Sequence, residues 1–168
     1  QRWNLNLRPG TSDLDSFQEN DYEVCNFQPQ DRWLDVGSNV GSFGLKYYQQ
    51  VDKIVSVEAD LENYECMVQN YELNGADIVT VRGAVVGDNT TEIDFYPCSV
   101  HGTTMHSPLP IKGRQKVTVP AVNIDTLIDQ YQINKLKIDI EGGEWNVLRG
   151  MTRWEPIQEI IFEFHKGL

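Results

Sequence analysis

The chain has 168 residues, of which 40% are hydrophobic and 23% are charged. This length and composition fit one globular domain with a conventional core and exclude a disordered chain. No apolar run approaches the roughly 20 residues that a membrane span needs, and the formal net charge of -11 opposes binding to nucleic-acid phosphates. We therefore expect a soluble protein, one domain over residues 1–168, with neither a membrane nor a nucleic acid as its partner.

The three cysteines, Cys25, Cys66 and Cys98, lie far apart and outside any C-x-x-C spacing. This pattern predicts neither a disulfide framework nor a zinc site, and it suits a reducing cytoplasm. The chain opens with Gln1 and no signal-peptide pattern follows. We therefore expect a sequence that has been trimmed, at one end or at both.

Short runs rich in Val and Ile, typical of buried parallel strands, occupy residues 32–37, 53–58, 78–84, 135–140 and 159–164. Helical patterns between them begin near Gly41, span 61–73 and 123–131, and follow Gly143 toward Leu148. Strands that alternate with helices predict an α/β fold, with a mostly parallel sheet and helices on both faces.

One segment interrupts this alternation. Residues 90–97 and 115–122 alternate in hydrophobicity like antiparallel strands, and the loop between them contains His101, Thr104 and His106. We expect an inserted β-hairpin here. Loops of this length in a compact domain are often functional.

Polar residues follow the strands at the edge where open α/β sheets bind ligands. They are Asp35, Glu58, Asp139 with Glu141, and Glu163 with His165, while Gly83 and Ala84 end the third strand. The carboxyl ends of several strands therefore converge on one predicted site.

The turn after the first strand indicates which ligand this site holds. It reads D-x-G-x-x-x-G from Asp35 to Gly41, and Asn39 breaks the G-x-G-x-x-G spacing of a dinucleotide site. Residues 45–47 lack the Gly-Lys-Ser/Thr of a phosphate-binding loop. Glu58, 23 positions after Asp35, is placed to accept both ribose hydroxyls of a nucleoside. The alternative is structural, with Asp35 as a helix cap and Glu58 as a solvated strand end.

Several segments resemble one family. "DVGSNVGSFGL", "VEAD", "VNIDTLID" and "LKIDIEGGEWNVLRG" are similar to the FkbM family of S-adenosylmethionine-dependent methyltransferases. With residues 8–17 and 161–165 the resemblance covers nearly the whole chain, and the K-I-D-I-E-G-x-E run from Lys137 to Glu144 is its most restrictive part.

The resemblance implies a Rossmann-like class I methyltransferase fold and S-adenosylmethionine as the cofactor. The glycine turn would hold the methionine portion, Glu58 would bind the ribose, and Ala59, Asp60 and Ala84 would bracket the adenine. The cofactor-binding residues are then expected to be Asp35, Gly37, Ser38, Asn39, Gly41, Glu58, Ala59, Ala84 and Asp139.

The resemblance also implies catalytic residues beside the sulfonium and the acceptor hydroxyl, namely Glu141, Asp139 and His165. A general base among them would assist loss of the acceptor proton. Alternatively, the same three side chains hold a divalent cation. No metal-binding spacing such as H-E-x-x-H is present, so we expect no metal. Glu144 is explained by the dipole of the helix that it begins.

The expected acceptor contacts lie outside the cofactor motifs. They are Arg8, Ser12 and Asp13 in the N-terminal segment 1–30, and Thr104 in the hairpin loop. The resemblance favours an O-methyltransferase that acts on a hydroxyl of a sugar, a glycan precursor or another small metabolite. The alternative is a catalytically silent domain that binds the cofactor, or its demethylated product, within a larger assembly.

Overall fold

In a computed structural model of the chain, the described residues are 3–19, 22–96 and 115–163. Five parallel strands form the main sheet in the order β3-β2-β1-β7-β8. Their bounds are β1 Arg32–Val36, β2 Lys53–Glu58, β3 Val79–Arg82, β7 Lys135–Ile138 and β8 Glu159–Phe162. The strand order reverses beside β1, which is where open α/β sheets bind ligands.

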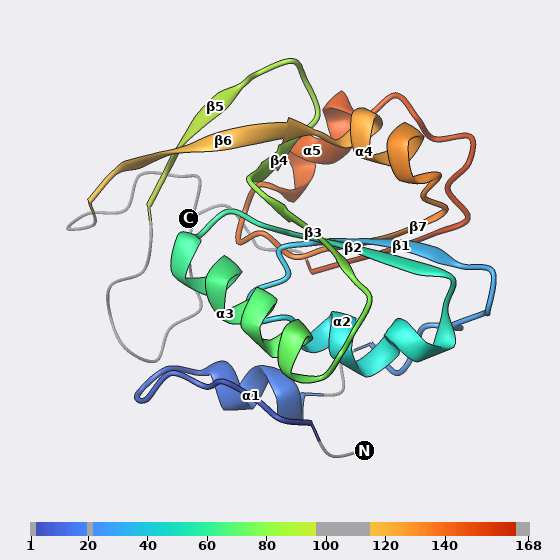
Figure 1. The fold of residues 1–168 in the computed structure, drawn as a ribbon. Helices are drawn as coiled ribbons and strands as arrows, with labels where there is room; N and C mark the ends of the chain where they lie inside the picture. Colours follow the sequence, from blue (N-terminus) through green and yellow to red (C-terminus); the bar gives the residue numbers. More distant parts are fainter. Residues whose placement is uncertain (1–2, 20–21, 97–114, 164–168) are drawn as a thin grey trace.

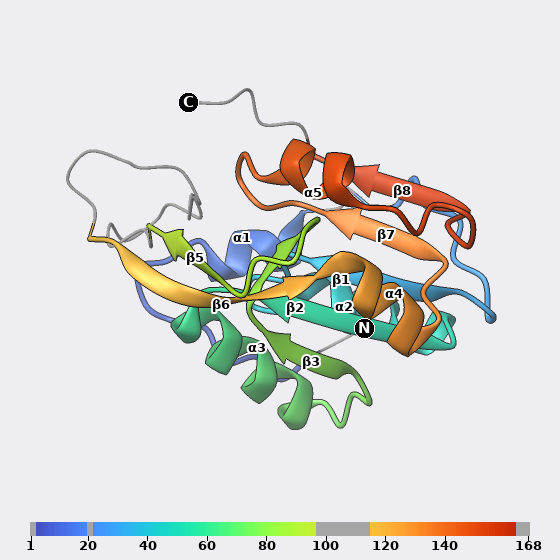
Figure 2. The ribbon, with the colours of Figure 1, turned by 90° about the horizontal axis from the view of Figure 1, so that it is seen from above.

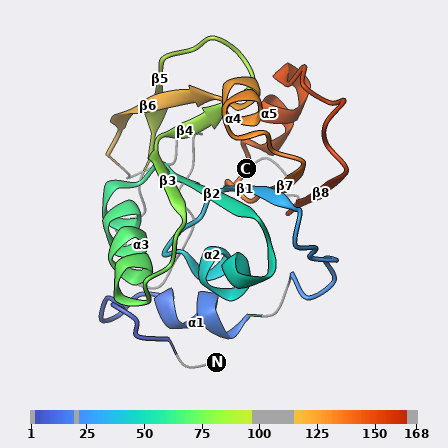
Figure 3. The same ribbon diagram turned by 45° about the vertical axis from the view of Figure 1, so that its right-hand side comes forward.

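Helices cover both faces of this sheet (Figures 1 and 3). One face carries α2 (Ser42–Tyr47), the 3₁₀ turn η1 (Tyr48–Gln50) and α3 (Leu61–Leu73), and α1 (Asp13–Gln18) lies outside them; the other face carries α4 (Ile124–Tyr131) and α5 (Glu144–Gly150). The predicted α/β architecture is confirmed, whereas α1 has no counterpart among the predicted helices. No helix among the described residues is both long enough and apolar enough to span a bilayer.

A second, three-stranded sheet has the order β4-β6-β5, with β4 at Ala84–Val86, β5 at Glu92–Phe95 and β6 at Val117–Asn123. The antiparallel β5–β6 pair confirms the predicted hairpin pairing, and Figure 2 shows it beyond the carboxyl ends of the parallel strands. The final residues of β6 pair in parallel with β4, a pairing that the sequence did not indicate. The loop segment 97–114, with Thr104, lies outside the described residues.

The predicted third strand is divided in two at Gly83. A Cβ at this position would lie 2.7 Å from Val122 Cγ2 and 3.0 Å from the Pro120 carbonyl oxygen. The chain therefore passes against β6 at this glycine, and the residues that follow join the second sheet as β4.

Alternate residues of β1 serve two cores. Leu34 and Val36 pack with α4 and α5, whereas Trp33 packs with aromatic residues of α2 such as Phe43. The side chains of Trp33, Leu34 and Val36 are essentially inaccessible to solvent. Burial on both faces accounts for apolar residues on both sides of this strand, and it also buries Asp35 between them.

Gly41 is required by packing, and this can be tested. Its φ is +88°, and a Cβ there would lie 2.6 Å from Tyr71 Cε1. We expect Gly41→Ala to lower the free energy of unfolding by ~1–2 kcal/mol for the left-handed backbone, plus ~1–3 kcal/mol for the crowding. Denaturant unfolding measures the loss. Gly75→Ala is the matched control because Gly75 also has a positive φ, +59°, but nothing lies within 4 Å of its Cβ position. An equal loss of unfolding free energy in the two variants would show that contact with Tyr71 does not contribute to the effect at Gly41.

Candidate functional site

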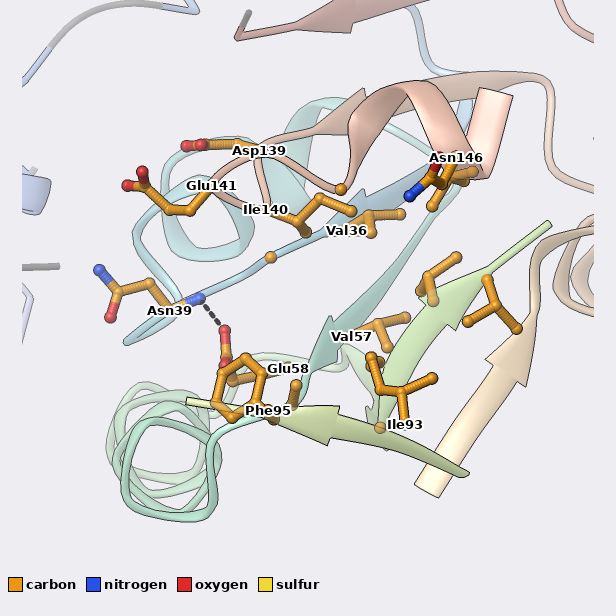
Figure 4. A pocket seen from close by; sticks show the side chains of 18 of the residues that line it. Val36, Asn39, Val57, Glu58, Ile93, Phe95, Asp139, Ile140, Glu141 and Asn146 are labelled. Carbon is orange, nitrogen blue, oxygen red and sulfur yellow. Dashed lines mark hydrogen bonds between the residues drawn. The ribbon is translucent and has the colours of Figure 1, made fainter. Parts of the chain in front are cut away.

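A cavity of about 800 Å³ opens at the carboxyl ends of the parallel strands. Its lining comes from the turn after β1, the end of β2, the strands β4 and β5, the loop after β7, and α5 (Figure 4). Residues in and beside α1, Asn63 of α3 and Glu163 after β8 complete the lining. This position and size are typical of a small-molecule site in an α/β fold.

Backbone hydrogen bonds hold the turn after β1 against strand β2. The N–H groups of Gly37 and Ser38 both donate to the Val57 carbonyl oxygen, at 3.0 and 3.1 Å. Gly37 has φ +81°, and a Cβ there would lie 1.9 Å from the Asp139 carbonyl oxygen. Glycine is therefore needed at this point by the fold itself, because the ends of β1 and β7 meet there.

Glu58 ends β2 with its carboxylate against the cavity. Oε2 accepts from the Asn39 N–H and Oε1 from the Asp60 N–H, both at 2.8 Å (Figure 4). The side chain is buried, and burial raises its pKa to about 7 despite these two bonds. Each oxygen accepts one backbone bond and keeps a second acceptor position. The carboxylate can therefore receive two hydroxyl donors from a ligand.

A buried cation lies beneath the turn. Lys137 Nζ donates to the Gly37 carbonyl oxygen at 2.7 Å, and lies 3.0 Å from Asp35 Oδ1 and 4.0 Å from Asp139 Oδ2. Burial disfavours the charged ammonium, but Asp35 and Asp139 outweigh it and raise the Lys137 pKa. Lys137 therefore stays charged and ties the turn after β1 to the end of β7.

The loop after β7 presents two acids. Asp139 and Glu141 extend to the same side of the loop, while Ile140 points toward Val36 (Figure 4). Glu141 has φ +54°. Glu144 holds this conformation, since its buried carboxylate accepts from the N–H groups of Ile140 and Gly142 at 3.1–3.2 Å. Glu144 thus shapes the loop, beyond the favourable interaction with the helix dipole expected from the sequence.

The structure separates the predicted site residues into three groups. Those that line the cavity are Ser12, Gly37, Asn39, Glu58, Ala59, Ala84, Asp139 and Glu141. Those that do not line it are Arg8, Asp13, Asp35, Ser38, Gly41 and Asp60. The remaining two, Thr104 and His165, lie outside the described residues.

The predicted residues that do not line the cavity support it. Ser38 Oγ donates to the Asp35 carbonyl oxygen at 2.8 Å within the turn, and Gly41 faces Tyr71. The Asp60 carboxylate caps α3 by accepting from the Asn63 N–H at 3.0 Å. Each residue therefore fixes the backbone that presents Glu58 or the turn after β1.

Arg8 and Asp13 bind each other. The guanidinium donates to both carboxylate oxygens of Asp13, at 3.0 and 2.8 Å, and to Asn63 Oδ1 at 2.7 Å. This pair fastens the N-terminal segment to α3. It leaves Ser12 and the α1 residues Asp15 and Ser16 to line the cavity, rather than Arg8 and Asp13 themselves.

Much of the cavity wall is apolar and was not singled out from the sequence. The side chains are those of Val36, Val57, Val85, Ile93, Phe95 and Ile140. The alternation in β5 was the available signal, because it places Ile93 and Phe95 on one face of the strand. Among the described residues, no three His, Cys, Asp or Glu side chains are grouped so that they could hold a metal ion.

The family follows from a comparison with known proteins. The model of the methyltransferase FkbM domain matches residues 35–168. The chain belongs to the FkbM methyltransferase family. Its fold is also similar to that of the crystal structure of methyltransferase FkbM from Methylobacillus flagellatus, with a TM-score of 0.51 at 18% identity over 80% of this chain and 32% of that one.

Two curated relatives are similar to the chain at low sequence identity. The chain is 22% identical over 138 residues to the hexuronic acid methyltransferase AglP of Haloferax volcanii, covering 80% of this chain and 56% of AglP. It is 26% identical over 170 residues to methyltransferase 1 of Beauveria bassiana, covering 84% of this chain and 68% of the relative. The chain thus spans little more than half of AglP.

The raised pKa of Glu58 predicts a pH dependence of stability. Between the ordinary value of 4.5 and about 7, the folded protein binds more protons at Glu58 than the unfolded chain does. The free energy of unfolding should therefore fall by about 3 kcal/mol as the pH rises through this window. Denaturant unfolding of the parent and of Glu58→Gln from pH 4 to pH 8 isolates this contribution as their difference.

The control for net charge is Glu62→Gln, a change at an exposed position of α3. Its difference from the parent should stay small across the same pH range. If the difference in unfolding free energy between the parent and Glu58→Gln does not vary with pH, the pKa of Glu58 is not raised in the folded protein.

Proposed function

We propose that the chain is an S-adenosylmethionine-dependent O-methyltransferase that acts on a hydroxyl of a sugar, a glycan precursor or another small metabolite. Family membership supports methyl transfer. The observation that carries the choice of cofactor is Glu58, a buried carboxylate with one open acceptor position on each oxygen at the cavity.

The residues of the cavity fit this cofactor. Glu58 would accept the two ribose hydroxyls, and the Gly37 turn would hold the methionine portion. Ala59, Ala84 and Phe95 offer small and apolar contacts for the adenine ring. The acids of the loop after β7 suit its positive charge. When bound, the cofactor supplies an electrophilic methyl group.

The residues of the chain would orient the acceptor of the methyl group and receive the proton that it loses. Methyl transfer requires the acceptor oxygen in line with the bond that breaks, so positioning provides much of the rate. Asp139 is engaged by Lys137 and by the Tyr22 hydroxyl. Glu141, which lines the cavity on the same side of the loop as Asp139, is the group that we assign to accept the proton.

The charge of the cavity favours acceptors without an anionic group. Its described lining includes eight acids and one base, Arg149: the acids are Asp15, Glu19, Glu58, Asp88, Asp94, Asp139, Glu141 and Glu163. A like charge at close range is unfavourable even near a protein surface. We therefore expect a neutral or amino-bearing saccharide to be methylated in preference to a uronate, unlike the substrate that the name of AglP gives.

We extend the proposal to a cytoplasmic location on the evidence of the thiols. Cys25 and Cys66 are free and buried. Burial raises the pKa of both and keeps them as unreactive thiols. Free cysteines are usual in a reducing compartment.

The first test is cofactor binding. We expect S-adenosylmethionine and its demethylated product to bind at micromolar concentrations in calorimetry, and NAD not to bind. Glu58→Ala should weaken binding by about 1.5–3 kcal/mol, as for a hydrogen bond to a charged group. Glu62→Ala, on the exposed part of α3, should bind like the parent. NAD binding without a response to the methyl donor would refute the cofactor assignment.

The second test is methyl transfer. Glu141→Gln keeps the shape of the side chain but removes the proton acceptor, so turnover should fall by ~10²-fold with little change in cofactor affinity. Asp139→Asn should reduce both turnover and cofactor affinity. The measurement is single-turnover transfer from labelled cofactor to matched hexosides, amino sugars and uronates. Glu155→Gln, in an exposed turn, is the control.

Two outcomes would count against parts of the proposal. Parent-like turnover of Glu141→Gln would remove Glu141 from the role of base. Tight cofactor binding without transfer to any acceptor in the panel would favour a silent binding domain instead.

A further inference from the structure

Tyr22 lies in the N-terminal segment, before residue 35, where the match to the family model begins. It is therefore not among the residues that family membership assigns to the site. Nevertheless its hydroxyl donates to Asp139 Oδ2, at 3.4 Å, across the fold. Tyr22 thus connects the N-terminal segment to an acid that lines the cavity.

The ring of Tyr22 is placed by contacts that do not involve its hydroxyl. It packs edge-on against Phe43 with 5.4 Å between ring centroids, and Lys137 Nζ lies 5.7 Å from its centroid. Burial raises the pKa of Tyr22 above its ordinary value, although Lys137 opposes this shift and the acids Asp35, Asp139 and Glu163 add to it. The hydroxyl therefore stays protonated and acts as a donor.

Both partners of Asp139 engage the same oxygen. Lys137 Nζ lies 4.0 Å from Oδ2, and the Tyr22 hydroxyl donates to Oδ2 as well. The Asp139 side chain keeps 27% of its surface exposed, whereas that of Lys137 keeps only 5%. Oδ2 is thus anchored, while the side chain as a whole stays partly accessible and Asp139 lines the cavity.

We propose that Tyr22 is a positioning residue, which fixes the Asp139 carboxylate by its Oδ2 so that Oδ1 meets the positively charged methyl donor. This inference deepens the proposed function and rests on it, because it takes Asp139 to be a cofactor contact. Lys137 attracts the Asp139 carboxylate by its charge, and the hydrogen bond from Tyr22 fixes the orientation of that carboxylate. A hydrogen bond donated to a carboxylate also favours its charged form.

The test is a double-mutant cycle on cofactor affinity. Tyr22→Phe removes the hydroxyl and keeps the ring contacts with Phe43 and Lys137. We expect it to weaken S-adenosylmethionine binding 3- to 10-fold, the order of one hydrogen bond, in calorimetry at pH 7. Combined with Asp139→Ala, which removes the acceptor of this hydrogen bond, it should cause no further loss, because Tyr22 acts through Asp139.

The matched control is Tyr64→Phe. The Tyr64 hydroxyl forms a bond of similar length, 3.3 Å to Thr80 Oγ1, away from the cavity lining. This variant should bind the cofactor like the parent, and both Tyr→Phe variants should unfold at similar denaturant concentrations. A loss of affinity in Tyr64→Phe as large as in Tyr22→Phe would indicate a general effect of destabilisation and overturn the inference.

The outcomes separate this inference from the proposed function. If the parent binds no S-adenosylmethionine, the proposed function fails. If the parent binds it and Tyr22→Phe binds equally well, the positioning role fails alone. Additive losses in the double variant would also overturn it, since Tyr22 would then act independently of Asp139.

Discussion

The site depends on one buried ion pair, that of Lys137 with Asp35. These residues are register partners on adjacent strands, β7 and β1, and their charged atoms lie 3.0 Å apart with almost no exposure to solvent. Removal of one member of a buried pair typically costs about 3–5 kcal/mol, because the other is left uncompensated. Lys137 also binds the Gly37 carbonyl oxygen. The pair therefore fixes the two strand ends that carry the turn after β1 and the loop after β7, and Gly37 must be a glycine because these ends meet.

The remaining walls follow from how the chain continues past the sheet. After β3 the chain passes against β6 at Gly83 and continues as β4 in the second sheet. The β4-β6-β5 sheet places Ile93 and Phe95 opposite the loop after β7 (Figure 4). On the other side, the Arg8–Asp13 pair fastens the segment that leads into α1. The cavity is thus enclosed by segments that the parallel sheet does not itself position. This division is consistent with the proposed function, in which the sheet would bind the cofactor and the added segments would contact the acceptor.

Sequence reasoning predicted the parts of this arrangement that have a period or a spacing. The alternation of strands and helices gave the parallel sheet, and the distance from Asp35 to Glu58 indicated two acids at adjacent strand ends. It did not predict α1, which is six residues long, because so short a helix has little periodicity. It named Gly41 as part of the cofactor-binding turn and did not predict that the packing of Tyr71 also requires a glycine there. Contacts between segments distant in the chain decide such cases, and they leave no local pattern.

The acids illustrate why residue type and position alone do not identify a binding group. Glu144 and Glu58 are both buried, and both accept backbone N–H groups. Glu144 uses three such bonds to close the loop after β7, and it does not line the cavity. Glu58 uses one on each oxygen at the cavity wall. Asp13 gives both of its oxygens to Arg8. What distinguishes a carboxylate that binds a ligand from one that supports the fold is the acceptor capacity left after its own backbone and side-chain partners have been satisfied.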